Sequence, residues 1–425
     1  MSLEDVQLFG DGAQEHWYES YEILHAEQPV LKLKGEGITP DTDAYVLTKY
    51  EDISRVVKDL DRYPGTLNQL AEDIRNGATL PEALKEIDVM VQSVASLRYN
   101  QELWRAHRRE LTDPWIGPSG TSRHQKMIEQ HAHTLIDQWI DHPEVDFVSQ
   151  FARPLPQRVM ATILGFPLED IPKLAEWGDA QVMDYVYGQG HKGILSPEQT
   201  QKKFKELDGF RDYVADIVKM KRADPQDDMI SYLSTVEYQA LGRKLTELEI
   251  NGIVYAMVLG GLETTQYAIE EQAQLLCDKP DLFQRLKKDR SLIRQFTEEA
   301  MRLRSPTQGL TTRITTQDEE FQGVKVPKGS LLHMRYAAAN VDPEEFDCPY
   351  ELQMDRKSSA RHLAFSAGVR VCPGASISRL EQITAWNCLF DRLDHIEYGQ
   401  DNDFKHQPGL MLGTLKLNLK FQKAV

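Results

Sequence analysis

The most informative segment of this 425-residue chain is His362-Leu363-Ala364-Phe365-Ser366-Ala367-Gly368-Val369-Arg370-Val371-Cys372-Pro373-Gly374-Ala375. It places Cys372 between glycines and directly before a helical pattern that runs from Ser376 to Leu389. Glycines allow tight turns in which backbone N–H groups point at the sulfur, and a helix N-terminus favours negative charge. The pattern therefore predicts a loop that stabilises the Cys372 thiolate as a metal ligand. The alternative is an inert cysteine packed in a glycine-containing loop.

The spacing Phe365-x-x-Gly368-x-Arg370-x-Cys372-x-Gly374 resembles the complete cysteine-loop signature of cytochromes P450. The resemblance implies that haem b binds at this loop, with Cys372 as the axial ligand of the iron. A cysteine thiolate ligand favours O–O cleavage at haem. The resemblance also implies that Phe365, Gly368 and Gly374 contact the cofactor and that Arg370 reaches a haem propionate.

The remaining cysteines are Cys277, Cys348 and Cys388, which lie far apart and form no CxxC pair. This spacing favours neither a zinc ribbon nor a disulfide framework. We expect buried, inert thiols at these three positions.

A second motif is Gly260-Gly261-Leu262-Glu263-Thr264-Thr265, which interrupts a mostly apolar helical pattern from Asn251 to Gln272. Interior glycines destabilise a helix by up to about 1 kcal/mol each, and a hydroxyl beside a carboxylate distorts the helix through local hydrogen bonds. The motif is similar to the distal-helix motif of cytochromes P450. That similarity implies that Gly260 lies against haem, Glu263 supplies protons, and Thr264 holds dioxygen and its water. Taken alone, the segment is equally compatible with a glycine-kinked core helix.

Three further residues resemble the propionate ligands of the family. Trp104 and Arg108 stand one helical turn apart, as in the family's Trp-x-x-x-Arg pair, and Arg313 follows Pro306 at the expected place. Haem carries two propionates, so a buried haem requires cationic or hydrogen-bonding partners.

A structural ion network is predicted behind the cysteine loop. Glu299 and Arg302 are three residues apart in the helical run Leu292 to Leu303, so their side chains share one face. They resemble the Glu-x-x-Arg pair of the family, and Arg356 fits the third position of its network.

The fold class that these patterns predict is mainly α with small β-sheets. The resemblance implies one P450 haem domain over residues 1–425, with haem between the long distal helix and the helix that follows the cysteine loop. We expect strands at Ala44–Leu47 and within Thr311–His333, and a late hairpin at Leu410–Phe421. Ser366 departs from the family pattern, in which a second glycine is common.

The substrate pocket is predicted from the segments that vary most in the family. Its expected wall includes Leu259, Leu310, Met411 and Leu412, which are all apolar, and Gln308 as a polar handle. The glycine-containing stretch 185–190 predicts a mobile lid.

Charge and composition restrict the partners. Lys plus Arg is 49 and Asp plus Glu is 66, which gives a formal net charge of -17 and argues against nucleic acid. The N-terminus lacks a signal-peptide pattern and no apolar run approaches a bilayer span, so we expect a cytoplasmic monomer without a membrane anchor.

The function that the resemblance implies is a monooxygenase that uses O2 to oxidise a small-to-medium, mainly apolar organic molecule. Ferredoxin and ferredoxin reductase would deliver electrons from NAD(P)H, which acts only indirectly. The alternatives are a peroxygenase or isomerase with thiolate-ligated haem, a non-enzymatic haem-binding sensor, and a haem-free helical scaffold. The acid–threonine pair Glu263-Thr264 argues against the first of these alternatives.

Overall fold

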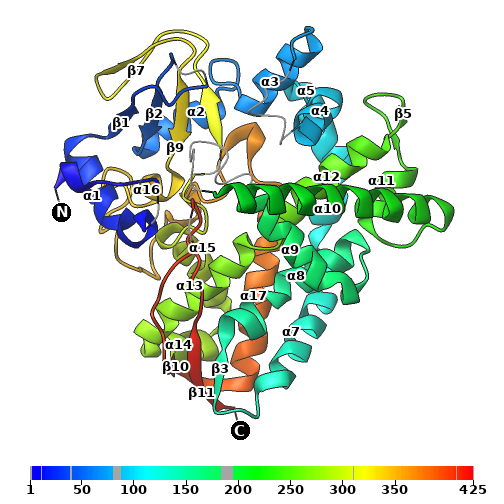
Figure 1. The fold of residues 1–425 in the computed structure, drawn as a ribbon. Helices are drawn as coiled ribbons and strands as arrows, with labels where there is room; N and C mark the ends of the chain where they lie inside the picture. The colour runs from blue at the N-terminus through cyan, green and yellow to red at the C-terminus, as the bar shows by residue number, and fades with distance from the viewer. Residues whose placement is uncertain are drawn as a thin grey trace.

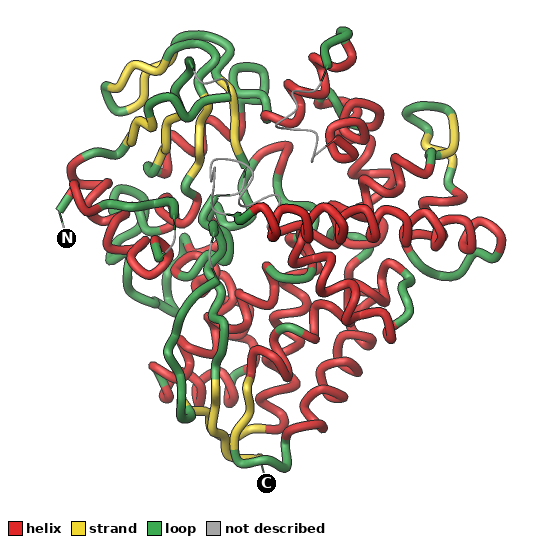
Figure 2. The backbone as a smooth tube through the Cα atoms, in the orientation of Figure 1, coloured by secondary structure: helices red, strands yellow, loops and turns green. Residues whose placement is uncertain are grey.

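The computed structural model describes residues 2–10, 12–38, 41–79, 88–182, 195–309, 311–407 and 409–424. Helices dominate these residues, and the strands form small sheets at separate places in the molecule (Figures 1 and 2). The predicted fold class, mainly α with small sheets, is confirmed. In the described part of the chain, no helix is both long and apolar enough to cross a membrane.

The helices carry the following bounds: α1 Trp17–Glu27, α2 Tyr50–Lys58, α3 Thr66–Arg75, α4 Asp88–Leu97, α5 Gln101–His107, α6 Asp113–Ile116, α7 Gln125–Trp139, α8 Pro154–Leu164, α9 Ile171–Val182, α10 Pro197–Ala223, α11 Met229–Thr235, α12 Glu247–Gly261, α13 Thr264–Asp278, α14 Pro280–Lys288, α15 Ile293–Leu303, α16 Tyr336–Asn340 and α17 Ala375–Arg392. A π-helical turn, Arg108–Thr112, continues α5 directly.

A four-stranded sheet has the order β1-β2-β9-β6. Its strands, with the nearby pair β7 and β8, have these bounds: β1 Val30–Leu33, β2 Ala44–Leu47, β6 Thr312–Ile314, β7 Glu319–Phe321, β8 Val324–Val326 and β9 Leu331–Met334. The parallel β2/β9 pair lies between antiparallel neighbours. The strand predicted at Ala44–Leu47 and the short strands predicted within Thr311–His333 are confirmed.

A three-stranded sheet has the order β10-β11-β3. These strands are β3 Glu144–Asp146, β10 Leu393–Tyr398 and β11 Asn418–Lys423, and a short hairpin is formed by β4 Glu237–Tyr238 and β5 Arg243–Lys244. The predicted hairpin at Leu410–Phe421 is wrong, because β11 pairs with β10 and β3. Leu410, Met411 and Leu412 belong to no strand. They lie in a loop that is buried, which explains why the sequence is apolar there.

Local sequence explains where two of the long helices begin. Ser196 caps α10 and Thr246 caps α12, each by accepting a hydrogen bond from the backbone N–H three residues later. Both form capping boxes, and Pro197 occupies the first turn of α10, where a missing N–H costs nothing.

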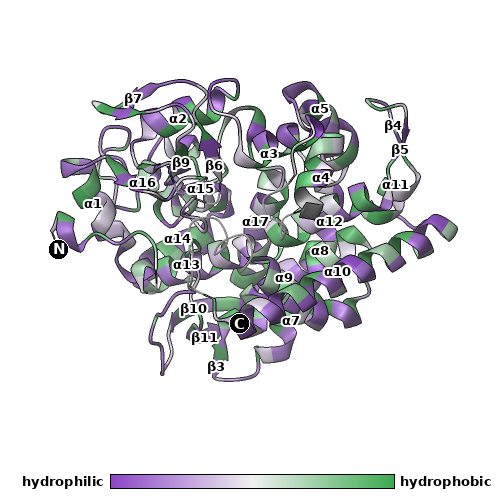
Figure 3. Ribbon diagram, turned by 45° about the horizontal axis from the view of Figure 1, so that its top comes forward, coloured by the Kyte–Doolittle hydropathy of each residue, from purple (hydrophilic) through white to green (hydrophobic). Residues whose placement is uncertain are grey.

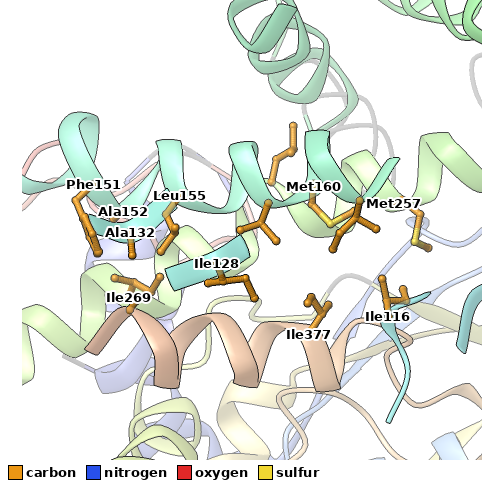
Figure 4. Packing of buried hydrophobic residues seen from close by; sticks show 14 of the residues in the cluster. Ile116, Ile128, Ala132, Phe151, Ala152, Leu155, Met160, Met257, Ile269 and Ile377 are labelled. Carbon is orange, nitrogen blue, oxygen red and sulfur yellow. The ribbon is translucent and has the colours of Figure 1, made fainter. Parts of the chain in front are cut away.

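The core lies around α17, which packs against α7, α13 and α15. Figure 4 shows Ile128 of α7, Leu155 of α8, Ile269 of α13 and Ile377 of α17 gathered in this core. Most helices change colour around their circumference in Figure 3, as amphipathic helices do when they bury one face. This packing fixes α17, and with it the loop that carries Cys372.

Of the cysteines outside the loop, Cys388 is buried and Cys277 is partly buried, whereas Cys348 is exposed. The expectation of a buried thiol is therefore wrong for Cys348. This residue lies in a surface turn with a φ of 44°.

Candidate active site

A cavity of about 390 Å³ lies between the α12–α13 junction and the cysteine loop. One wall includes Gly260, Gly261, Thr264 and Thr265, and the opposite wall includes Phe365 and the segment from Cys372 to Gly374. Trp104, Arg108, Arg313 and Arg370 line the cavity as well. The fold thus brings together four segments that lie far apart in the sequence.

The cysteine loop is held in shape by its backbone. The Cys372 N–H donates to the Phe365 carbonyl at 2.9 Å. Gly368 has a φ of 72°, and a Cβ there would lie 3.1 Å from the Val57 carbonyl oxygen, so this position requires glycine. Ser366 also has a positive φ, 59°, and its hydroxyl lies 3.2 Å from that of Tyr336. Gly368 contacts α2 and does not line the cavity, whereas Gly374 lies beside the sulfur.

Cys372 is partly buried, and desolvation of its thiol raises the pKa. The N–H groups of Gly374 and Ala375 act in the opposite direction, as the sequence predicts, and so do the charges of Arg108 and Arg379, but their combined effect is smaller. The expectation that the loop by itself favours the thiolate is therefore corrected. A cation at the sulfur would supply the missing stabilisation.

Two side chains of the α5 segment tie this region to the loop. The Trp104 indole N–H donates to the Val369 carbonyl and the Arg108 guanidinium donates to the Val371 carbonyl, both at 2.9 Å. The Arg370 guanidinium lies 3.9 Å from the centre of the Trp104 ring. Trp104 therefore packs between the helix and the loop and orients Arg370 toward the cavity.

Four arginines line the cavity: Arg98, Arg108, Arg313 and Arg370. Of these four arginines, only Arg108 lies within ion-pair distance of a carboxylate of a described residue, that of Asp113 at 2.7 Å. Burial and the charges of Arg313 and Arg98 lower the pKa of Arg370 to about 9. Burial likewise lowers the pKa of Arg98 to about 10.

Sequence reasoning missed Arg98 and His107. Arg98 is 7% exposed, its Nε has no hydrogen-bond partner, and its Nη1 lies 3.5 Å from the Nε2 of His107. Burial and the neighbouring arginines hold the pKa of His107 well below its usual range, so the imidazole is neutral. The sequence signal that could have indicated Arg98 is its position directly after the mostly apolar helix α4.

The α12–α13 junction is a break of two residues, Leu262 and Glu263. The Thr264 hydroxyl donates to the Gly260 carbonyl at 2.7 Å, and a Cβ on Gly260 would meet no atom within 4 Å. The predicted distortion of this helix is confirmed.

Glu263 is buried, and its Oε2 accepts a hydrogen bond from the Tyr267 hydroxyl at 2.7 Å. Burial raises the pKa of Glu263 to about 7, and the charge of Asp179 acts in the same direction. The hydrogen bond from Tyr267 and the charge of Arg153 lower it. Glu263 therefore changes protonation near neutral pH.

The predicted ion network is assembled behind the cysteine loop. Arg302 donates to both carboxylate oxygens of Glu299 at 2.8 and 2.9 Å, and Arg356 donates to Glu299 at 2.9 Å. Glu299 and Arg302 have no exposed side-chain surface. Arg302 also donates to the Asn340 and Pro349 carbonyls, which fixes the segment leading to the loop.

A second buried ion cluster was not predicted. Arg379 of α17 pairs with Glu298, and His362 contacts the same carboxylate at 3.2 Å. The Arg379 guanidinium lies 4.5 Å from the centre of the Phe365 ring. His362, for which the sequence indicated no role, thus helps to hold the first residues of the loop.

The predicted substrate wall is only partly formed by the expected residues. Leu259 and Met411 line the cavity. Leu412 packs in the main core, and Gln308 is fully buried, with Tyr21 donating to it at 2.6 Å. The expectation that Leu412 and Gln308 line the substrate pocket is therefore wrong, because both side chains are packed inside the protein. Leu310 and the predicted lid at 185–190 lie outside the described residues.

Comparison with known families agrees with this geometry. The family model described as Cytochrome P450 matches residues 45–421. The chain is a cytochrome P450. It therefore belongs to a family of haem-thiolate monooxygenases.

Its relatives are bacterial P450s. The polyketide biosynthesis cytochrome P450 PksS of Bacillus subtilis is 27% identical, with 92% of each chain covered. The 6-deoxyerythronolide B hydroxylase of Saccharopolyspora erythraea is 26% identical, with 93% of each chain covered. The structure of P450BioI with a fatty-acid-ligated acyl carrier protein superposes with a TM-score of 0.80 at 26% identity, covering 96% of this chain and 99% of that one.

The residues of the cavity fit haem. Its arginines Arg98, Arg313 and Arg370 lack carboxylate partners among the described residues, and the Nε atoms of Arg98 and Arg313 are buried without a hydrogen bond. An apolar cavity with such cations requires an anionic occupant, and two propionates meet this need. In the P450, Cys372 would ligate the iron, and the space above Gly260 would receive the macrocycle.

Proposed function

We propose that this P450 inserts one oxygen atom of O2 into a small-to-medium, mainly apolar organic substrate. The single observation that carries the proposal is the cavity that joins the Cys372 sulfur to Thr264 and to an apolar wall. When bound, haem supplies the activation of dioxygen with electrons and protons, so that one oxygen atom enters the substrate and the other leaves as water.

The two residues at the helix break have separate roles in this proposal. Thr264 donates its hydroxyl proton to Gly260, so the lone pairs of its Oγ1 are free to accept a hydrogen bond from a protonated group in the cavity. Glu263 holds a proton near neutral pH because it is buried, and it passes that proton toward Thr264.

The apolar side of the cavity would bind and orient the substrate. Leu67, Val94, Met257, Leu259 and Met411 line it. Apolar side chains exclude water and favour an apolar guest, whereas the few polar groups fix its orientation. One of the relatives is named as the hydroxylase of an organic molecule, 6-deoxyerythronolide B.

For electron supply, we propose ferredoxin and a ferredoxin reductase that draws electrons from NAD(P)H. Arg105 and Arg109 are exposed on the α5 segment, next to the Trp104 and Arg108 tethers of the cysteine loop. Such cations attract an acidic redox protein to this side of the molecule.

The first experiment is an absorption spectrum of the purified protein after reduction with dithionite and addition of carbon monoxide. A strongly red-shifted Soret band that disappears in Cys372→Ala would establish thiolate-ligated haem. Substrates are then identified by the spin-state shift that they cause. Product formed under ¹⁸O2 must carry one labelled oxygen, and unlabelled product would overturn the proposed reaction.

The electron donor is tested separately, by reconstitution with ferredoxin and its reductase. Reduction should slow as ionic strength rises, and more steeply in the protein than in Arg105→Gln. Turnover that proceeds with peroxide but not with reduced ferredoxin would favour a peroxygenase instead.

A further inference from the structure

The Glu263 carboxylate is directed away from the cavity. Gly260, Gly261 and Thr264 line the cavity wall at the helix break, whereas Glu263 is 7% exposed and is not among the lining residues that the structure describes. Its Oε2 instead accepts the 2.7 Å hydrogen bond from Tyr267. To reach the Thr264 hydroxyl, the carboxyl group must leave Tyr267 and rotate toward the cavity.

Tyr267 is held firmly in place by packing. It is 3% exposed and clusters with Leu410 and Met411. Gly413 lies directly against its ring, since a Cβ at that position would be 1.9 Å from the Tyr267 Cδ1. The ring therefore has no room to move, and the hydroxyl is a fixed donor at the fourth residue after Glu263.

The charged groups around Glu263 lead from the interior toward solvent. Arg153, just before α8, pairs with Asp179 of α9 at 2.9 Å, and their side chains are 34% and 47% exposed. Both groups act on Glu263 electrostatically. Among the described residues, Glu270 of α13 is the remaining acid near Tyr267, and it is fully buried with its oxygens bound by Gln266 and the Thr414 N–H. Of these acids, Asp179 is the one that reaches solvent, so it offers a route for a proton.

We propose that Tyr267 is a positioning residue that latches Glu263 on the solvent side of the helix break, where the carboxylate takes up a proton by way of Asp179. Release from Tyr267 lets the protonated carboxyl turn toward Thr264 and give up that proton, after which Glu263 returns as a carboxylate. Glu263 gains one proton from solvent and delivers one proton toward Thr264, so the step balances without another reactant. The inference rests on the proposed role of Glu263.

The physical basis of the latch is preferential binding of the charged form. The Tyr267 hydroxyl donates to the carboxylate and so lowers the pKa of Glu263, against the larger effect of burial. A hydrogen bond to the charged form of a carboxyl group lowers its pKa by about one to two. Without the hydroxyl, Glu263 should keep its proton to higher pH and lose its fixed orientation.

The test compares Tyr267→Phe with Tyr213→Phe, in the haem-loaded protein. Tyr213 is a matched control, because its hydroxyl also donates to a carboxylate, that of Asp170 at 2.8 Å, outside the cavity. The first readout is the pH titration of the Glu263 carboxyl band in infrared difference spectra, assigned by its loss in Glu263→Gln. The second is the pH profile of product formed per NAD(P)H consumed, with its solvent isotope effect.

In Tyr267→Phe, the titration of the Glu263 band and the falling limb of the pH profile should both move upward by about one unit. Tyr213→Phe should leave both unchanged. If Tyr267→Phe leaves both where the parent protein has them, while Glu263→Gln removes the limb, the latch is wrong and the proposed function stands. If Glu263→Gln itself changes neither coupling nor the pH profile, the proposed role of Glu263 fails, and the latch with it.

Discussion

The two walls of the cavity are built in opposite ways. On the cysteine side, Glu299 binds two arginines, and Arg379 and His362 share Glu298. On the side of the helix break, Glu263 accepts a hydrogen bond from Tyr267 and has a raised pKa. Its neighbour Thr264 lines the cavity.

The difference separates rigidity from chemistry. Buried ion pairs with complete partners are costly to rearrange, so they hold the Cys372 loop in one geometry. A buried acid that titrates near neutral pH and a hydroxyl at a helix break can change their state during a reaction. The variants below test whether the cysteine side maintains the structure and whether the helix break takes part in the reaction.

The largest effect is expected at the sulfur itself. Cys372→Ala removes the thiolate ligand, so the protein should lose the red-shifted band of the carbon monoxide complex and all monooxygenase activity. The absorption spectrum and a product assay measure the two losses. Cys388→Ala, a buried cysteine remote from the cavity, is the control and should retain both. A full red-shifted band in Cys372→Ala would overturn the ligand assignment.

On the rigid wall, Glu299→Gln should lower the free energy of unfolding by about 3–5 kcal/mol, because it leaves the charges of Arg302 and Arg356 buried without their carboxylate. Urea unfolding of the haem-loaded protein measures the change. Asp216→Asn breaks an exposed pair with Lys219 and should cost less than about 1 kcal/mol. Equal small losses in both variants would contradict a structural role for the buried network.

On the chemical wall, Thr264→Ala should reduce product formed per NAD(P)H by at least about tenfold while NAD(P)H consumption continues. The neighbouring hydroxyl provides the comparison, since Thr265 donates to Ser378 of α17 at 2.9 Å. Thr265→Ala should cost about 1 kcal/mol of stability and leave coupling intact. Unchanged coupling in Thr264→Ala would remove this residue from the mechanism.

The smallest effect is expected for Arg98, which lies outside both the cysteine loop and the segment at the helix break. Arg98→Met should speed haem loss by about tenfold, as expected when one charged hydrogen bond to a propionate is removed. The same change should stabilise the haem-free protein, because it removes an unpaired buried cation. Transfer of haem to apomyoglobin measures the first effect, with the exposed Arg105→Met as control. Unaltered haem loss would exclude Arg98 from propionate binding.

Sequence reasoning was most successful for structure that depends on neighbours along the chain. The cysteine loop, the Glu263-Thr264 pair and the Glu299-x-x-Arg302 turn are local patterns, and the strand at Ala44–Leu47 is a short apolar run. It was wrong for Leu412, Gln308 and the hairpin at 410–421. Each of those errors assigned a direction or a partner to a side chain that only distant segments determine.

The sequence by itself indicated the family and singled out Cys372 and the Glu263-Thr264 pair as candidate site residues, because spacing within one loop or one helical turn fixes which groups can meet. The tertiary structure alone decided that Tyr267 binds Glu263 under the constraint of Gly413, and that Arg98 joins Arg313 and Arg370 around one cavity. Those contacts depend on burial and on charges brought together by packing, which no local pattern encodes.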